Sequence, residues 1–203
     1  MRTFQVAVAA AALTSGLHGQ EPSEQAIMRM ATAIQRAIST LPNYGLFDDI
    51  TFGIKGYDVT LRGYASRPSL KESAERVVKK IEGVEKVANE IEVLPLSGND
   101  DQIRASVYAR IYGHTALSRY NPNRGVPLYL SPARLAAGIT NDPPTGKHPI
   151  HILVKNGNVT LRGVVDSAAD KAIAGIQANS APGAFSVVNE IQVAGDSKPR
   201  KAK

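Results

Sequence analysis

The 203-residue chain contains no cysteine and no tryptophan, and aromatic residues make up only 5% of it. Without cysteine it has no disulfides, thiolate metal ligands, cysteine nucleophiles or lipidated N-terminal cysteine. The scarcity of aromatic residues argues against recognition of nucleic acid by base stacking. Hydrophobic residues account for 43% and charged residues for 21%, which is typical of a globular protein rather than a disordered one.

Long hydrophobic runs are also missing. The longest apolar run, Phe4–Leu13, has about ten residues, half of the roughly 20 that a membrane-spanning helix needs. It follows Arg2 and precedes the polar stretch 14–19, which is the layout of a secretory signal peptide. We therefore predict a signal peptide over residues 1–20 and a protein exported to the periplasm, peripheral to the outer membrane, with no transmembrane segment in the mature form. The alternative is a leader that stays attached.

Catalytic motifs are absent from the sequence as well. It has no glycine-rich phosphate loop after a strand, no G-x-S-x-G and no H-E-x-x-H. His148 and His151 flank Pro149 without an acidic cluster beside them, which is poor spacing for a metal site. The adjacent carboxylates 48–49 and 100–101 stand at the starts of elements, where helix capping or solvation explains them. We predict no catalytic residue, no metal and no cofactor, and hence no enzyme.

What the chain does contain is an internal repeat. The segment Val59–Gly63 recurs without change as Val159–Gly163, and about 15 of the 44 positions in 50–93 are identical to those in 150–193. Two copies are too few for a solenoid, so each copy must close its own core. We predict a first domain over 21–96 and a second over 97–195.

The first copy has the pattern helix, strand, strand, helix, strand. Ser23 or Glu24 is expected to cap a helix with apolar residues at helical spacing, which ends at Pro42. Alternating residues around the turn 56–58 predict a hairpin, and Gly63 is expected to permit a bend or close backbone approach. Ser69 is expected to open a second helix as part of a capping box.

Gly83 should end that helix, and alternation over 87–93 predicts a third strand. The link between the last two strands is long enough for a parallel crossover. Asn89, and likewise Asn189, stand in phase with buried positions, where an amide that satisfies backbone groups is the favoured interpretation. We therefore predict an α+β fold of two tandem αββαβ domains, each a three-stranded mixed sheet with two helices on one face.

The second copy repeats this order around a proline-rich insertion at 121–149, which holds six of the twelve prolines. Asp100 or Asp101 is expected to cap its first helix. The turn 156–158, Asn-Gly-Asn, is a strong hairpin signal. Asp166 or Ser167 should open the last helix, with Ala169, Ile173 and Ile176 facing inward. The insertion cannot be a long helix or an inner strand, so we expect a surface loop.

The formal net charge of +6 lies in the second half of the chain. Residues 21–98 carry 10 basic and 11 acidic side chains, 99–195 carry 9 and 6, and the tail 196–203 carries 4 and 1. Such a distribution suggests a polyanionic partner, although a solvated tail is the alternative. On the first helix, Arg29 and Arg36 share an outer face that is expected to be solvated, with a lipid-phosphate contact as the less favoured interpretation.

Arginines and tyrosines form a strip at helical spacing on the first helix of the second copy. Such a strip is typical of a partly buried helix shoulder, but it is also what a helix resting on phospholipid headgroups would present. The residues predicted to bind lipid are Arg104, Tyr108, Arg110, Tyr112, Arg119, Lys198, Arg200, Lys201 and Lys203.

The repeated V-T-L-R-G strand, the helix that ends at Gly83 or Gly183, and the strand of form V-x-N-E-I-x-V together resemble the BON domain family of exported bacterial proteins. The resemblance covers both copies except the insertion and tail. It implies the same α+β domain, a periplasmic or outer-membrane association, and a link to anionic phospholipid, envelope integrity and osmotic or other stress. It supplies no catalytic residue.

Our first hypothesis is therefore a non-enzymatic binding module of the cell envelope, peripheral to anionic phospholipid surfaces. The alternative is a protein-interaction or chaperone-like module that binds envelope proteins through the insertion. Nucleic-acid binding ranks third, because export and the low aromatic content argue against it.

Overall fold

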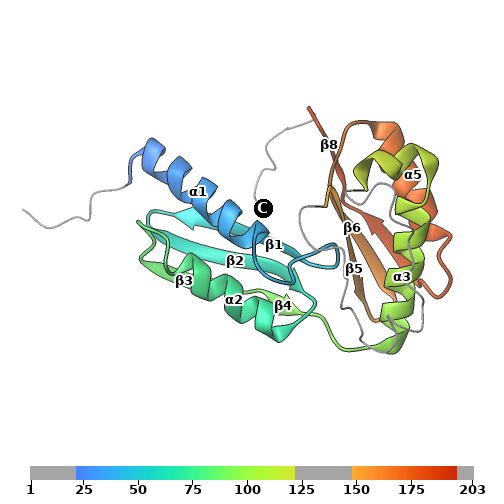
Figure 1. Cartoon of the computed structure of the whole chain (residues 1–203), viewed down its shortest axis with the longest axis horizontal. Coiled ribbons are helices and arrows are strands. Elements are labelled where there is room, and N and C mark those ends of the chain that lie inside the picture. The colour runs from blue at the N-terminus through green and yellow to red at the C-terminus, as the bar shows by residue number, and fades with distance from the viewer. Residues whose placement is uncertain (1–21, 122–147, 196–203) are drawn as a thin grey trace, which may run out of the picture.

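The structure is a computed structural model that describes residues 22–121 and 148–195. It contains two domains, one extending from α1 to β4 and the other from α3 to β8, which lie next to each other along the long axis (Figure 1). Each has a mixed sheet with helices on one face, which confirms the predicted α+β fold of tandem αββαβ domains. The expected signal peptide, most of the insertion and the basic tail lie outside the described residues.

The first domain contains α1 (Glu24–Ser39), β1 (Asp49–Lys55), β2 (Asp58–Ala65), α2 (Pro68–Val78), β3 (Lys86–Asn89) and β4 (Glu92–Val93). β1 is antiparallel to β2, whereas β3 and β4 are both parallel to β2. The predicted third strand is thus broken into two short pieces. The parallel pairing confirms the predicted crossover through α2.

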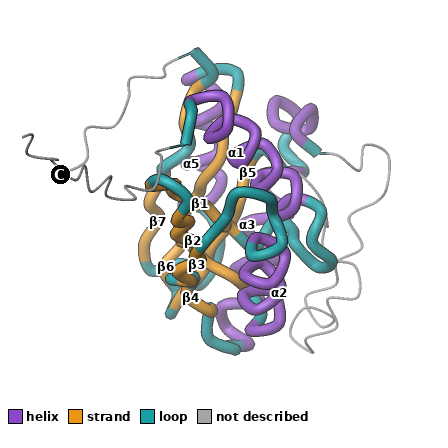
Figure 2. The backbone as a smooth tube through the Cα atoms, turned by 90° about the vertical axis from the view of Figure 1, so that its left-hand side faces the viewer, coloured by secondary structure: helices purple, strands orange, loops and turns teal. Residues whose placement is uncertain are grey.

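The second domain contains α3 (Gly98–Tyr112), a 3₁₀-helix η1 (Thr115–Tyr120), β5 (Ile150–Lys155), β6 (Asn158–Val165), α5 (Ala168–Asn179), β7 (Ser186–Asn189) and β8 (Gln192–Val193). Its sheet repeats the first: β5 is antiparallel to β6, and β7 and β8 are parallel to β6. Figure 2 shows the helices of both domains to one side of the strands.

The predicted helix caps are observed at two of the four α-helix starts. Ser23 accepts a hydrogen bond from Ala26 N and Ser167 accepts one from Asp170 N, as expected. The other two expectations are wrong. α2 begins at Pro68 after Arg67 and has no side-chain cap, so Ser69 is already inside the helix. α3 is capped by Ser97 rather than by Asp100 or Asp101.

The glycine of the repeated V-T-L-R-G strand is needed for close backbone approach. Gly63 has φ of 106° and Gly163 has φ of 124°, in the left-handed region. A Cβ at Gly63 would overlap the carbonyl oxygen of Asp49, and one at Gly163 would overlap that of Pro149. The recurrence of this glycine therefore has a steric cause, as the sequence suggests.

Asn89 and Asn189 explain why the third strand breaks in both domains. Each donates from its amide nitrogen to a helix carbonyl, Lys71 O at 3.0 Å in one case and Lys171 O at 2.7 Å in the other. Each also accepts from the amide two residues later, Ile91 N or Ile191 N. The side chain satisfies backbone groups at the break and ties the helix to it, which confirms the structural interpretation of these residues.

The inward face of α5 differs from the predicted one. Ile173 packs against the core as expected, but Ala169 is exposed and Ile176 is 64% exposed, so for these two the prediction is wrong. The buried positions are Asp170, Ala174, Gly175 and Ala178. Asp170 is buried because it receives hydrogen bonds from several groups, and the helix is rotated to place it inward.

The two domains are joined by more than their linker. Leu46 and Phe47, which precede β1, pack in the hydrophobic core of the second domain. Ile152 N in β5 donates a hydrogen bond to Leu46 O at 3.0 Å, so this segment pairs with the edge of the second sheet. The ring centroids of Tyr44 and His151 lie 6.1 Å apart across the same boundary. A segment of the first domain therefore completes the second.

Candidate functional site

The predicted strip on α3 lies in the interior of the second domain. Arg104 is 7% exposed, and its Nη2 donates to Val154 O at 2.7 Å while Nη1 pairs with Asp101. Tyr108 and Tyr112 are buried as well, and burial raises the pKa of both phenols. The Tyr112 hydroxyl donates to Ile150 O at 2.6 Å. Arg104 and Tyr112 fasten α3 to β5, and the Tyr108 ring lies 5.2 Å from that of Tyr112, as the alternative interpretation of a buried helix shoulder describes.

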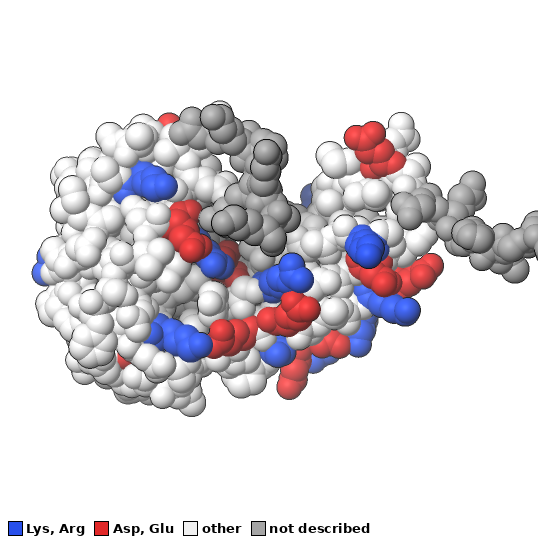
Figure 3. Space-filling model, turned by 180° about the vertical axis from the view of Figure 1, so that it is seen from behind, with Lys and Arg blue, Asp and Glu red and all other residues white. Residues whose placement is uncertain are grey.

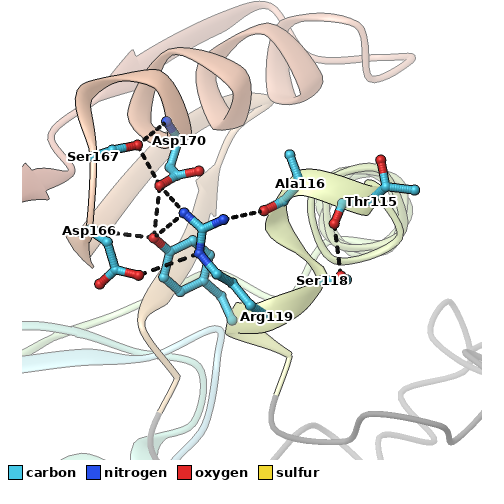
Figure 4. Close-up of polar contacts among 8 residues, drawn as sticks. Thr115, Ala116, Ser118, Arg119, Asp166, Ser167 and Asp170 are labelled. Carbon is cyan, nitrogen blue, oxygen red and sulfur yellow. Dashed lines mark hydrogen bonds and ion pairs between the residues drawn. The ribbon is translucent and has the colours of Figure 1, made fainter.

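Arg110 and Arg119 lie at the surface of the second domain but are not free. Arg110 donates to Ser180 Oγ at 3.0 Å. Arg119 forms ion pairs with Asp166 and Asp170 and also donates to Ala116 O, which links η1 to the start of α5 (Figure 4). The charge of Arg119 is therefore neutralised within this cluster, and its contacts join η1 to α5. Of the five predicted residues that the structure describes, Arg110 alone presents an exposed cation without an acidic partner.

The cluster around Asp170 predicts a pH dependence of stability. Hydrogen bonds from Ser167 and Tyr120, together with the Arg119 charge, lower the pKa of the Asp170 carboxyl. A folded-state pKa below the unfolded one stabilises the fold above the unfolded pKa of about 3.9, and this stability is lost as the pH falls through the folded value. We expect Asp170→Asn to destabilise the second domain at pH 7 but much less at pH 3, as measured by urea unfolding. An equal loss at both pH values would contradict this origin.

The remaining predicted lipid-binding residues, Lys198, Arg200, Lys201 and Lys203, lie outside the described residues, as does most of the insertion.

The outer face of α1 is a surface to which the sequence alone assigned little weight. Arg29 and Arg36 are exposed on it, and neither forms an ion pair with any residue in 22–121 or 148–195. Met28, which directly precedes Arg29, is 64% exposed. The acidic residue of this helix, Glu24, lies in its first turn. The two guanidinium groups therefore project into solvent beside an exposed apolar side chain.

Shallow depressions surround these residues. One, of about 620 Å³, extends along the helix and is lined by Met28, Arg29, Thr32, Ala33, Arg36, Ala37 and Thr40. Another, of about 410 Å³, lies between α1, the β1–β2 turn and the segment after α2, and is lined by Ala26, Arg29, Met30, Ala33, Tyr57, Ile81, Glu82 and Gly83. Arg29 lines both, so a ligand phosphate held there would have an apolar depression next to it. We name this area the α1 surface.

Another hollow, of about 610 Å³, lies at the boundary between the domains. Its central side chain is Arg162, which donates to Asp49 at 2.9 Å and Glu190 at 2.8 Å and lies 5.5 Å from the ring centre of Tyr64. Arg62 pairs with Glu90 in the matching position of the first domain, but it is far more exposed. Lys155 and Glu92 form a further pair across the boundary.

This hollow is suited to joining the domains rather than to binding an ion. Each cation in it has a carboxylate partner, and Figure 3 shows basic and acidic side chains next to one another along the boundary and over the first domain. A charged ligand would have to displace an existing ion pair. The α1 surface, where the cations have no such partners within residues 22–121 and 148–195, is the better candidate.

Within residues 22–121 and 148–195 no group of three or more His, Asp or Glu side chains is arranged to hold a metal ion. His148 is buried, with its ring 6.3 Å from that of Tyr112, and His151 contacts the first domain through Tyr44.

No helix in the described parts of the chain has both the length and the apolar character to span a membrane. The fold is a duplicated α+β module, with one domain in each half of the chain. The chain belongs to the BON domain family, whose domain model matches residues 31–95 and 133–195. BON domains are associated with binding at the membrane and cell envelope, and membership indicates a non-catalytic, envelope-associated module.

No curated protein matches the sequence significantly. Two solved structures of CdsD, a structural protein of the type III secretion system of Chlamydia trachomatis, are similar to it at 13% identity. The first match covers 81% of this chain and 92% of the other with a TM-score of 0.26. The second, a C-terminal domain, covers 80% and 96% with a TM-score of 0.25. Superposition at this level has no functional implication for the present chain.

Proposed function

We propose that this protein is a non-enzymatic module of the cell envelope that associates peripherally with anionic phospholipid surfaces. The observation that carries the proposal is the α1 surface, where Arg29 and Arg36 lack ion-pair partners among the described residues and lie beside the exposed Met28. Phosphate oxygens pair well with guanidinium groups, and an exposed methionine adds apolar contact with the headgroup boundary.

In this proposal the second domain contributes Arg110 and the basic tail, with Lys198, Arg200, Lys201 and Lys203. Each cation close to an anionic surface contributes about 1 kcal/mol, so several weak contributions can add up to useful binding. The proposal includes removal of residues 1–20, a location in the periplasm at the outer membrane, and a role in envelope integrity under osmotic or other stress.

The α1 surface is tested by removing its two cations. We expect Arg29→Ala/Arg36→Ala to weaken binding to phosphatidylglycerol vesicles by about 30-fold, since two contacts of about 1 kcal/mol each are lost. The measurement is cosedimentation with the vesicles at low salt. The matched control is Arg62→Ala/Lys79→Ala, which removes the same charge from two exposed residues already paired with Glu90 and Glu75.

Two outcomes would contradict the proposal. One is equal binding of the unaltered protein to phosphatidylglycerol and neutral vesicles. The other is an equal loss in the control and in the α1 variant, which would mean that net charge alone, rather than this surface, directs binding.

The tail makes a separate prediction. Deletion of residues 197–203 removes four basic side chains and one hydroxyl residue, Ser197, while leaving Asp196 in place. We expect weaker binding to phosphatidylglycerol vesicles and a flatter dependence on salt, because screening acts on fewer exposed charges. An unchanged salt dependence would show that the tail does not contact the surface.

A further inference from the structure

The two domains provide an internal comparison at their outer strands. β3 and β7 occupy the same edge of their sheets, and residues 100 apart are equivalent, as Thr60 beside Ala88 and Thr160 beside Val188 show. Around β3 the chain has Glu85 and Lys86. The equivalent residues around β7 are Phe185 and Ser186. The charges of the first edge are therefore missing from the second.

The replacements at the second edge are exposed. Phe185 is 81% exposed, Val188 is 51% exposed, and Ile176 on the flanking helix, at the position of Arg76, is 64% exposed. Charged residues, lysine above all, commonly protect edge strands from pairing with other chains. The first domain has this protection, whereas the second has apolar side chains at the same places. In Figure 3 the visible face of the second domain is largely uncharged.

The backbone of β7 also has unpaired groups at this edge. Glu190 N donates to Leu161 O on the β6 side, and Leu161 is the register partner of Asn189 in the parallel pairing of β6 with β7. In a parallel pair a residue bonds to the two neighbours of its partner, so Ser186 and Val188 direct their backbone groups toward β6, and Val187 between them directs its amide and carbonyl away from it. No further strand pairs with β7 among the described residues. Figure 2 shows β7 at one margin of the strands.

We propose that β7 is a self-association edge, at which β7 of one chain pairs antiparallel with β7 of a second copy. The directions of the backbone groups place Ser186 of each copy opposite Val188 of the other, with Val187 on the two-fold axis. The two sheets then become continuous.

A second copy fits this edge better than a charged partner does. In a two-fold contact each surface meets itself, so a charged surface repels its equivalent and an uncharged one does not. The chain has a net charge of +6, but the residues at this edge are uncharged. The exposed apolar side chains Phe185, Val188 and Ile176 are not buried in the core of their own domain. With only four residues in β7, the contact is small, so we expect a weak, concentration-dependent dimer.

The first test restores the charges of the first domain. Phe185→Glu/Ser186→Lys introduces the residues that the equivalent edge already carries, so the fold should accept them, and the net charge is unchanged. We expect it to weaken dimerisation of the full chain at least about tenfold in sedimentation equilibrium, since charges enter an apolar contact. The control Thr32→Glu/Gln35→Lys makes the same change on α1 and should leave dimerisation unaltered.

The second test uses the absence of cysteine. In the proposed register the two Val187 residues form a hydrogen-bonded pair, whose Cα atoms lie about 5.5 Å apart, within reach of a disulfide. We expect oxidised Val187→Cys to form a covalent dimer and Val87→Cys, at the same position of β3, to remain monomeric. A monomer at all concentrations, a dimer insensitive to the edge variant, or equal crosslinking of both cysteine variants would overturn the proposal.

Discussion

Gly63→Ala is expected to destabilise the first domain by about 3 kcal/mol, the upper range for a strained non-glycine backbone. Gly63 has φ of 106°, which L-residues rarely adopt. The added Cβ would also overlap Asp49 O, a backbone atom that moves only if β1 and β2 separate locally. The midpoint of urea unfolding, followed by circular dichroism, measures the loss.

Gly53→Ala is the matched control for this variant, because it lies in the same hairpin. Gly53 has no positive φ, and nothing lies within 4 Å of a Cβ added there. Glycine in the middle of a strand lowers the stability of the fold by about 0.5–1 kcal/mol relative to alanine, so this variant should be neutral or slightly stabilising. Similar losses in both variants would mean that the close approach at Gly63 is not the cause.

Asp100→Asn is expected to destabilise the second domain by about 3 kcal/mol, the upper range for a hydrogen bond to a charged group. Asp100 is 1% exposed, and its carboxylate accepts hydrogen bonds from Asn156 N at 2.9 Å and Gly157 N at 2.8 Å. It thus joins the first turn of α3 to the β5–β6 turn. In the variant an amide NH₂ group faces one of these two N–H donors, so a buried donor loses its acceptor.

Urea unfolding, with hydrogen exchange of the turn at 156–157, measures the effect of Asp100→Asn. Asp166→Asn is the control, because the Asp166 side chain is 70% exposed and its ion pair with Arg119 is long, at 3.4 Å. Exposed pairs of this kind contribute little, so we expect a change within about 0.5 kcal/mol. If Asp100→Asn and the control unfold at the same urea concentration, Asp100 does not anchor the turn.

Asp100 also illustrates what local sequence patterns miss. A carboxylate at a helix start predicts a cap, but Ser97 supplies the cap of α3 and Asp100 is used by a turn 56 residues away. In the same way, the pattern on α5 predicts Ile176 inward, whereas contacts from Tyr120 and Ser167 place Asp170 there. Hydrogen bonds such as those from Tyr120 to Asp170 and from Asn156 to Asp100 join distant residues, so they leave no periodic pattern in the sequence.

The Arg/Tyr strip of α3 shows the same limit for the binding surface. Helical spacing correctly places Arg104, Tyr108 and Tyr112 on neighbouring turns. It does not show whether that side meets solvent or the β5 backbone, and the structure has it buried. The exposed cations of α1 were visible in the sequence as Arg29 and Arg36. What identifies them as a candidate site is that neither pairs with a carboxylate in the described part of the chain, and this can be seen only in the folded structure.

The sequence by itself determined the duplicated αββαβ fold and its steric details, because periodicity, turn chemistry and the shared V-T-L-R-G segment are local or repeated signals. Gly63 and Asn89 could be interpreted correctly from their places in that pattern. Only the tertiary structure decided which charges are neutralised and how the domains join. Leu46 and Phe47 enter the core of the second domain, and Arg162 pairs with Asp49 across the boundary. These contacts join residues more than 50 positions apart, and they depend on shape and distance that no local pattern encodes.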